Sequence, residues 1–509
     1  MKTIIRKLSK SSPYAVVTSK NKKDIFDYLH IETNIEKDYV NILKNLTEKR
    51  VIFLCGSSGD GKSAIITRYQ KKFEDRYDFH LDATHSFSPK ETAFERLDKV
   101  FDDYKISEKS LVIGINIGIL INYAKYKIEN HNDIKQIINK YLKSYKKEIE
   151  DIIFINFEEY PKFESANDII ISKFLKGIFK KITLVSDKNP FYITYQKDKE
   201  NRTILSKNYE LLSMESIQDR IIELIVLTHL KYNQFLTARS ILDFIYTLLS
   251  SEKLLINILF EDTNSEIIKH IKNEDPCLQR DEVIDRFIIK QTNKEEDLEL
   301  NIFLKKIELQ DLTPCGILRL FYLLNSQNYA NNYHKKFFKS KLLIDKYIKI
   351  LISHNSFDDN KEVQDFYKEF KKAIFLYINR DKPELTNRLI ILKSNDFYIT
   401  VDANIVRDKR KIQEEKSIKL KSFDCYLLVN EKIIKPIEIT FNIYKMIQDI
   451  NRGYVPNKYD RNNLIIFKEF IDRIIDKIKV SNKLSFIDKN NNHYIYNEID
   501  DSEIEVEKI

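Results

Sequence analysis

One short segment constrains this chain more than any other. Residues 56–63 read Gly-Ser-Ser-Gly-Asp-Gly-Lys-Ser, which fits the pattern Gly-x-x-x-x-Gly-Lys-Ser/Thr, and the apolar run 51–55 precedes them. The 509 residues include only eight glycines, and three of these lie in the segment. A strand, a glycine-rich loop and a helix that follows at once are typical of a phosphate-binding loop. The segment therefore predicts a strand, loop and helix that together hold phosphate groups.

Each residue type in this loop suits the chemistry. Gly56 and Gly61 let the backbone approach a phosphate without a Cβ atom, and Lys62 can reach the β and γ phosphates. The Ser63 hydroxyl can ligate Mg²⁺, so we expect ATP and Mg²⁺ as cofactors. The alternative is a glycine-rich turn without a ligand, in which a lysine aimed at the hollow has no purpose. The predicted nucleotide-binding residues are Gly56, Ser57, Ser58, Gly59, Asp60, Gly61, Lys62, Ser63, Ala64 and Asn156.

The first third of the chain alternates strand-like and helix-like segments. Four segments have strand patterns, at 51–55, 77–81, 111–116 and 152–157. This βαβ alternation predicts an α/β fold with a mostly parallel sheet, helices on both faces and a ligand at the carboxyl ends of the strands. We expect a P-loop NTPase core of AAA+-like type with a helical lid. The predicted domains are an N-terminal segment at 1–45, the NTPase core at 46–198, a helical lid-like domain at 199–330, a basic helical region at 331–380 and a C-terminal α+β domain at 381–509.

The C-terminal pattern mixes both periodicities. Short strands are predicted at 398–401, 425–429 and 434–441, with helices near 443–451 and 464–479. The final residues, Asp500 to Ile509, are acidic and are expected to fray.

Composition argues for a globular chain. Apolar residues make up 43% of it and charged residues 32%, and the net charge of +8 permits a polyanionic partner such as nucleic acid. The N-terminal residues lack a continuous apolar run, and the longest apolar stretch, 111–121, is too short to span a bilayer. The four cysteines lie far apart with no metal-ligand spacing, so we expect reduced thiols and a cytoplasmic location. They are Cys55, Cys277, Cys315 and Cys425.

Hydrolysis needs acidic groups that the loop does not supply. The third predicted strand ends in Asn116, where an acidic residue is usual, and asparagine is a weak ligand for Mg²⁺ and no general base. Asp82, after the second strand, is our first choice for the metal and its water shell, so Ser63 and Asp82 form the predicted metal site. A helix cap or turn residue is the alternative for Asp82. Glu158 is a further catalytic candidate, and an exposed residue that opens a helix is the alternative for it and for Glu159.

Two more polar residues complete the predicted set. Arg239 lies in the first turn of a predicted helix, which resembles the placement of the sensor-2 arginine of AAA+ ATPases, and it can neutralise charge on a transferring phosphate. An exposed helix arginine is the alternative. Asn156 ends the fourth strand, where its amide can sense a γ-phosphate or form a turn. The predicted catalytic residues are Lys62, Asp82, Glu158 and Arg239.

Two other patterns are weaker. Asp424, Glu438 and Thr440 have the spacing of a metal-dependent nuclease core, but Thr440 stands where a lysine is expected. Polar residues on the wet face of an antiparallel strand pair fit the alternation better. His80 and His85 lack the helical spacing of a metal pair, so turn residues are the better interpretation.

Two basic stretches are candidates for DNA contact. Residues 334–349 and 407–421 are rich in lysine and arginine. On a helix, the first stretch can follow phosphates while its phenylalanines pack inward. Solvated amphipathic faces are the alternative. No pattern for base-specific reading is present.

Eight short segments before residue 330 carry a family resemblance. They lie at 8–16, 56–63, 79–87, 116–120, 189–192, 208–213, 275–278 and 319–324. In these segments the chain resembles the DptF family of DNA phosphorothioation-dependent restriction proteins. The resemblance implies a cytoplasmic ATPase subunit of a bacterial defence system that works with DptG and DptH proteins. Such systems restrict invading DNA that lacks phosphorothioate in its backbone.

Three functional interpretations stay open. The chain hydrolyses ATP to gate DNA engagement or partner activation, or it is a nucleotide-bound scaffold with little hydrolysis, or it is an AAA+-like ATPase of another defence system. Asn116 favours the scaffold, whereas Arg239 and the intact loop favour hydrolysis. A homo-oligomer is compatible with each of them.

Overall fold

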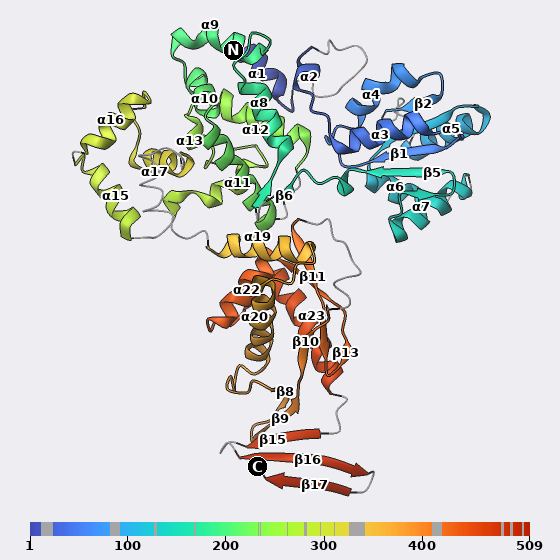
Figure 1. The fold of residues 1–509 in the computed structure, drawn as a ribbon, viewed down its shortest axis with the longest axis vertical. Coiled ribbons are helices and arrows are strands. Elements are labelled where there is room, and N and C mark those ends of the chain that lie inside the picture. Colours follow the sequence, from blue (N-terminus) through green and yellow to red (C-terminus); the bar gives the residue numbers. More distant parts are fainter. Residues whose placement is uncertain are drawn as a thin grey trace. The chain divides into compact units, whose positions relative to one another are not determined.

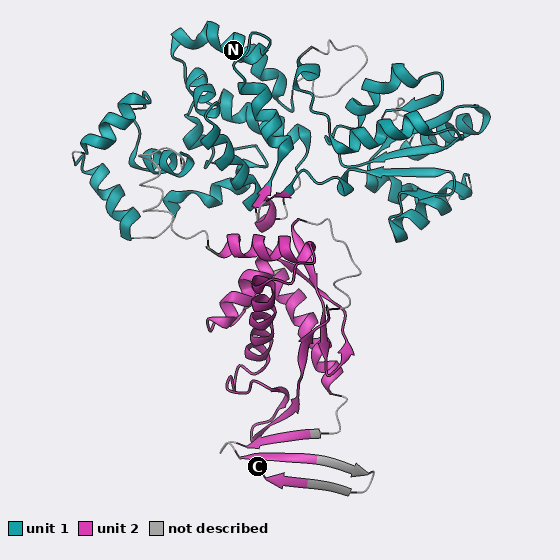
Figure 2. Cartoon of the chain, viewed as in Figure 1, with its two compact units in different colours: residues 1–164, 171–228, 234–339 teal, residues 165–170, 229–233, 340–509 magenta. Residues whose placement is uncertain are grey.

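The chain forms two compact units in the computed structural model (Figure 1 and Figure 2). Unit 1 comprises residues 1–164, 171–228 and 234–339, and unit 2 comprises residues 165–170, 229–233 and 340–509. The structure describes residues 1–11, 24–81, 92–126, 130–166, 169–232, 234, 236–261, 263–278, 282–295, 297–309, 311–324, 342–409, 420–479, 483–488, 492–500 and 503–508.

Unit 1 contains a five-stranded sheet with the order β2-β3-β1-β5-β4. The strand β1 (Val51–Cys55) pairs in parallel with β3 (Ser110–Ile115) on one side and with β5 (Ile152–Asn156) on the other. The outer strand β2 (Tyr77–His80) is parallel to β3, and the short β4 (Glu148–Ile149) is antiparallel to β5. The predicted α/β fold with a mostly parallel sheet is therefore confirmed.

Helices cover both faces of this sheet, because alternate residues of each strand point to opposite faces. The helices α3 (Asn34–Asn45) and α4 (Lys62–Phe73) pack on the face that carries Ile52 and Leu54. The opposite face, with Val51 and Phe53, is covered by three further helices. These are α5 (Ala93–Ile106), α6 (Ile117–Ala124) and α7 (Asn132–Ser144).

The chain changes direction along the sheet at β1. It runs from β1 through α4 to β2 on one side, and it later passes from β3 to β5 on the other side of β1. Such a switch point opens a crevice at the carboxyl ends of the strands, where ligands of open α/β sheets bind. The loop at residues 56–61 begins at this edge.

The rest of unit 1 is helical, as its pattern predicts. The N-terminal helix α1 (Lys2–Ile5) and α2 (Asp24–Leu29) precede the sheet, and no strand occurs among the described residues between 172 and 324. None of the described helices in either unit is long and apolar enough to cross a membrane. The helices after the sheet are α8 (Lys173–Thr183), α9 (Pro190–Asp198), α10 (Ile204–Leu212), α11 (Glu215–Tyr232), α12 (Ala238–Ser250), α13 (Leu255–Ile258), α14 (Ile268–Ile271), α15 (Glu282–Thr292), α16 (Leu298–Lys306) and α17 (Pro314–Leu323).

Unit 2 combines helices with antiparallel sheets. Its sheets have the orders β10-β12-β13, β11-β14 and β17-β16-β15-β9-β8. A further two-stranded sheet pairs β6 (Glu164–Ala166) with β7 (Ile169–Ile171), around residues 165–170 of this unit. Its helices are α19 (Leu342–Asn355), α20 (Lys361–Ile378), α22 (Phe441–Asn451) and α23 (Arg461–Ile478). Its other strands are β8 (Arg388–Lys393), β9 (Phe397–Asp402), β10 (Ile405–Arg407), β11 (Ser422–Cys425), β12 (Leu427–Val429), β13 (Lys432–Ile433), β14 (Ile437–Thr440), β15 (Lys483–Asp488), β16 (His493–Asp500) and β17 (Glu503–Lys508).

The prediction that the C-terminal residues fray is wrong. Residues 503–508 form β17, which pairs with β16 and places Val506 opposite Tyr496 and Lys508 opposite Tyr494. Glutamates alternate with Ile504 and Val506, which is the period of a strand with one polar face. The acidic composition concealed this alternation.

Candidate phosphate-binding site

The glycine-rich loop lies between the end of β1 at Cys55 and the start of α4 at Lys62. Gly61, the residue before the helix, has a φ of 106°, which L side chains rarely adopt, although a Cβ there would meet no atom within 4 Å. Backbone conformation, and not lack of space, therefore requires glycine at this position. Among the residues that the structure describes, no side chain caps the start of α4, so its first N–H groups are directed toward the loop without an acceptor from the helix.

The side chain of Lys62 lies within the loop. Its Nζ atom donates hydrogen bonds to the carbonyl oxygens of Gly56, at 3.0 Å, and Ser57, at 2.8 Å. Only 9% of the residue is exposed. The loop thus holds the Lys62 ammonium between its own carbonyl groups.

Ser63 connects the loop to the end of β2. Its Oγ donates to the carbonyl oxygen of Leu81 at 3.3 Å. The same carbonyl approaches β3 so closely that a Cβ on Gly114 would lie 2.6 Å from it. The predicted metal ligand Asp82 lies outside the described residues, as does His85, but its chain neighbour Leu81 contacts Ser63 directly.

Asp60 belongs to the interior of the loop. Its Oδ2 accepts a hydrogen bond from the Ser57 N–H at 2.7 Å, and its Oδ1 lies 3.2 Å from Nζ of Lys162. The carboxylate is 1% exposed. Asp60 therefore stabilises the conformation of the loop through its bond to the Ser57 N–H, and Lys162 neutralises the Asp60 carboxylate. Sequence analysis missed Lys162, which lies about a hundred residues away with no local motif around it.

The backbone of Arg239 lies at the loop. Its backbone N–H donates to the carbonyl oxygen of Gly59 at 3.3 Å. A Cβ on Gly59 would lie 3.1 Å from the Cβ of Arg239 and 3.2 Å from Oγ1 of Thr237. Thr237 caps α12 by accepting from the N–H of Ser240 at 3.0 Å. The start of α12 is therefore packed against the glycine-rich loop.

Asn156 is enclosed by its own neighbours. It is 2% exposed, its Nδ2 donates to the hydroxyl of Tyr141 at 3.3 Å, and its Oδ1 accepts from the Glu158 N–H at 3.1 Å. These bonds give Asn156 the turn role that was its alternative interpretation. Asn116 also caps a helix, because its Oδ1 accepts from the Gly118 N–H at 2.8 Å.

Glu158 is exposed on a short 3₁₀ helix, Phe157–Glu159. Its neighbour Glu159 is partly buried, and this desolvation raises the pKa of the Glu159 carboxyl, although Lys147 acts in the opposite direction. Burial raises the pKa of the Cys55 thiol as well, with Lys62 lowering it and Glu159 raising it. Glu159 is thus a partly buried carboxylate whose charge acts on Cys55, the last residue of β1.

The three residues with nuclease-like spacing do not assemble a metal site. Asp424 and Glu438 are directly opposite across β11 and β14, and the Ser422 hydroxyl donates to Glu438. The Thr440 hydroxyl accepts from the Ile443 N–H at 3.3 Å and caps α22. Throughout the described parts of the chain, no three His, Cys, Asp or Glu side chains group as metal ligands. Polar residues on one face of an antiparallel pair are the better description.

The basic stretches are described only in part. Residues 325–341 and 410–419 lie outside the described residues. Lys346 and Lys349 are exposed on α19. Arg407 instead forms an ion pair with Asp359, and its guanidinium lies 4.5 Å from the ring centre of Tyr367. Arg407 therefore stabilises unit 2 and does not present a free cation.

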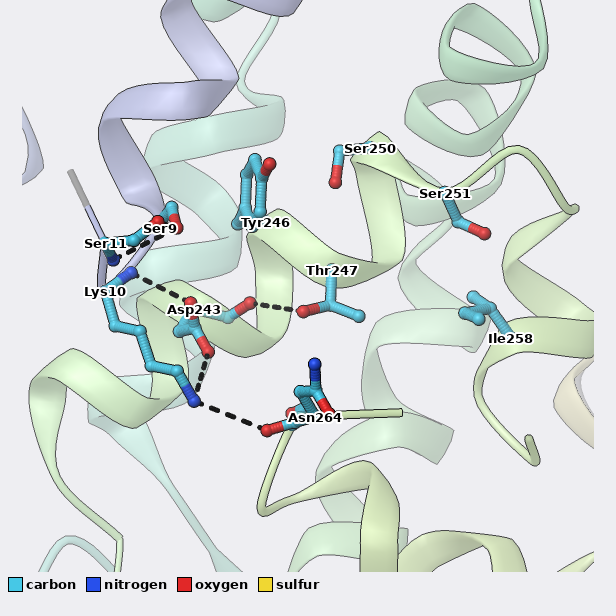
Figure 3. A pocket seen from close by; sticks show the side chains of 11 residues that line it. Ser9, Lys10, Ser11, Asp243, Tyr246, Thr247, Ser250, Ser251, Ile258 and Asn264 are labelled. Carbon is cyan, nitrogen blue, oxygen red and sulfur yellow. Dashed lines mark hydrogen bonds and ion pairs between the residues drawn. The ribbon is translucent and has the colours of Figure 1, made fainter. Parts of the chain in front are cut away.

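A polar pocket of about 380 Å³ lies in the helical part of unit 1 (Figure 3). One wall is the N-terminal segment, where the backbone N–H of Lys10 donates to Oδ1 of Asp243 at 2.8 Å and Lys10 Nζ lies 3.8 Å from Oδ2. These bonds hold the N-terminal segment on α12, one turn beyond Arg239. The lining residues are Ser9, Lys10, Ser11, Asp243, Tyr246, Thr247, Ser250, Ser251, Ile258, Asn264 and Ser265.

Together these features define an α/β protein with a mostly parallel sheet and a cation-holding, glycine-rich loop at its switch point. A search against known protein families finds no match, and no curated protein matches the chain.

Proposed function

We propose that this chain is a P-loop NTPase of AAA+-like type that binds ATP with Mg²⁺ at residues 56–64. The observation that carries this proposal is the position of the Lys62 ammonium, which the loop carbonyls hold at the switch point of a parallel sheet. A turn without a ligand gains nothing from a buried lysine. Burying a charge costs free energy unless the charge is paired or hydrogen-bonded.

The residues present fit a nucleotide phosphate. Backbone N–H groups at the start of α4 and the Lys62 ammonium are all donors, so the loop suits an anion with several oxygens. Ser63 offers a hydroxyl for Mg²⁺, and its bond to Leu81 supports the assignment of the adjoining Asp82 to the same metal shell. When bound, the Mg²⁺ complex of ATP supplies a phosphoanhydride bond that water can cleave.

The side chains around the loop have distinct tasks in this proposal. Lys62 neutralises phosphate charge, and Arg239 adds a second cation from the helical part, which its backbone contact with Gly59 supports. Glu158 is exposed, and Glu159 is the partly buried alternative for orienting a water molecule. We assign no ligand contact to Asn156, because its amide is already bonded within the protein.

The resemblance to the DptF family supplies the biological setting of the proposal. We propose an ATP-dependent subunit of a cytoplasmic restriction complex that acts on DNA lacking phosphorothioate, together with DptG- and DptH-like proteins. Two segments of the resemblance, 56–63 and 79–87, meet in the structure, and the segment 116–120 begins directly after a residue bonded to the loop. The Ser63 hydroxyl bonds to Leu81, and the Gly56 N–H bonds to the carbonyl of Ile115, next to Asn116.

A nucleotide-bound scaffold is the second candidate. The helix-capping role of Asn116 favours it, because this strand end beside the loop offers no carboxylate to activate water. An AAA+-like ATPase of another defence system would share the same site and differ in its partners.

ATP binding and hydrolysis by the purified chain test the proposal, with Lys62→Ala as the variant. Lys71→Ala is the matched control, because Lys71 is an exposed lysine of the same helix. We expect Lys62→Ala to lower turnover about a hundredfold or more, as loss of a transition-state cation does, and Lys71→Ala to have no effect. Assays with unmodified DNA, phosphorothioate DNA and co-purifying proteins then separate a restriction subunit from other ATPases. Binding without turnover under every condition would favour the scaffold, and absence of binding would refute both.

A further inference from the structure

Two short stretches of unit 2 lie, in the sequence, close to residues of unit 1 that contact the phosphate-binding loop. Residues 165–170 and residues 229–233 belong to unit 2, although the chain on both sides of each stretch belongs to unit 1. We call them the first and the second insert. Within a few residues of each insert, a residue of unit 1 contacts the glycine-rich loop.

The contact of the first insert is made by Lys162, three residues before it begins. The Lys162 ammonium forms the ion pair with the buried Asp60 carboxylate, which in turn accepts from the Ser57 N–H. The Lys162 carbonyl oxygen accepts from the Ser172 hydroxyl at 2.7 Å. Ser172 is fully buried, lies just beyond the insert and caps α8. The Lys162 carbonyl thus bonds to Ser172 on the other side of the insert in the sequence, and the Lys162 ammonium pairs with Asp60 of the loop.

The second insert includes the last residues of α11 (Glu215–Tyr232), and the chain that follows it in unit 1 contacts the same loop. Within unit 2, Nδ2 of Asn442 donates to the carbonyl of Lys231 in this insert at 2.7 Å. Thr237 and Arg239 follow a few residues later and pack against Gly59. Residues that flank both inserts in the sequence therefore contact neighbouring residues of one loop, Gly59 and Asp60.

We propose that Lys162 is a positioning residue that couples the occupancy of the glycine-rich loop to the two inserts, and through them to unit 2. This inference rests on the proposed nucleotide site. An anion in the loop competes with Asp60 for the Ser57 N–H and for the neighbouring positive charge. The anion therefore changes the strength of the ion pair between Asp60 and Lys162. Coupling between two sites is reciprocal, so the arrangement of the inserts also changes the affinity of the loop for its ligand.

The test measures the affinity of a fluorescent ATP analogue with Mg²⁺, together with hydrogen exchange of peptides that cover each insert, in the full chain. Lys162→Met leaves the buried Asp60 carboxylate without its cation, and we expect the affinity to fall about tenfold or more. Lys162→Arg restores the charge and is expected to bind within about threefold of the wild type. Lys173→Met is the matched control, because Lys173 forms an exposed ion pair with Glu164 in the same region.

Nucleotide is expected to change exchange in both inserts of the wild type, and this change is expected to shrink in Lys162→Met at saturating nucleotide. Ser172→Ala removes the bond to the Lys162 carbonyl together with the cap of α8, so it is expected to weaken the exchange response while affinity changes by less than about threefold. Equal affinity of Lys162→Met and the wild type, or no exchange response in the wild-type inserts despite binding, would overturn the coupling. Absence of binding by the wild type would instead refute the nucleotide site itself.

Discussion

The stability of unit 2 is expected to fall as the pH drops below 6.5, because of one buried histidine. His354 is 6% exposed, its ring centre lies 4.4 Å from that of Phe423, and its Nε2 lies 3.1 Å from the hydroxyl of Tyr367. Burial, assisted by the charge of Arg407, lowers the pKa of His354 from 6.5 to about 4. The folded protein therefore favours the neutral imidazole.

The magnitude follows from the two pKa values of this histidine. Above pH 6.5 the imidazole is neutral in both the folded and the unfolded chain, so the full stability is present. As the pH falls from 6.5 toward 4, the unfolded chain binds a proton that the folded chain does not, and stability is lost. A pKa difference of about 2.5, at 1.36 kcal/mol for each pH unit, amounts to about 3 kcal/mol, of which about 2 kcal/mol is lost by pH 5.

Hydrogen exchange of the full chain between pH 7.5 and pH 5 checks this prediction, after correction for intrinsic exchange rates. Opening free energies of peptides from α19 and α20 are expected to decrease by about 2 kcal/mol. The variant His354→Gln has no titrating ring, so its pH dependence is expected to be flatter by that amount. An equally steep dependence in His354→Gln, or none in the wild type, would refute the reasoning.

Two further predictions concern the stability of unit 1. Gly114→Ala places a Cβ 2.6 Å from the Leu81 carbonyl oxygen, a backbone atom, and is expected to cost about 2 kcal/mol in thermal denaturation. Gly177→Ala is its control, because the atom at the same 2.6 Å is the mobile end of a side chain, and a cost like that of Gly114→Ala would contradict this account. Asp275→Asn breaks the bidentate, largely buried ion pair with Arg319 and is expected to lower the free energy of unfolding by about 3 kcal/mol. The exposed pair of Arg286 with Glu282 is the comparison, since Glu282→Gln is expected to cost less than about 1 kcal/mol.

The sequence was sufficient for the strand and loop elements of the candidate site. The apolar runs before the loop and at 152–157 identified β1 and β5 to within a residue, because buried parallel strands are continuous apolar runs. Gly61 and Lys62 were found from the motif, although the sequence suggested close approach of a phosphate at Gly61, whereas the structure gives it a positive φ. Arg239 was found through its place in the first turn of a helix.

Only the tertiary structure assigned the partners of these residues. The pairing of Asp60 with Lys162 joins positions far apart in the chain, and no local pattern marks a lysine that neutralises a distant carboxylate. Asn156 and Asn116 are of a residue type that can sense a ligand, but nearby backbone N–H groups donate hydrogen bonds to their side-chain oxygens. Local periodicity determines which face of an element is buried, whereas the choice of partner depends on how elements pack in space.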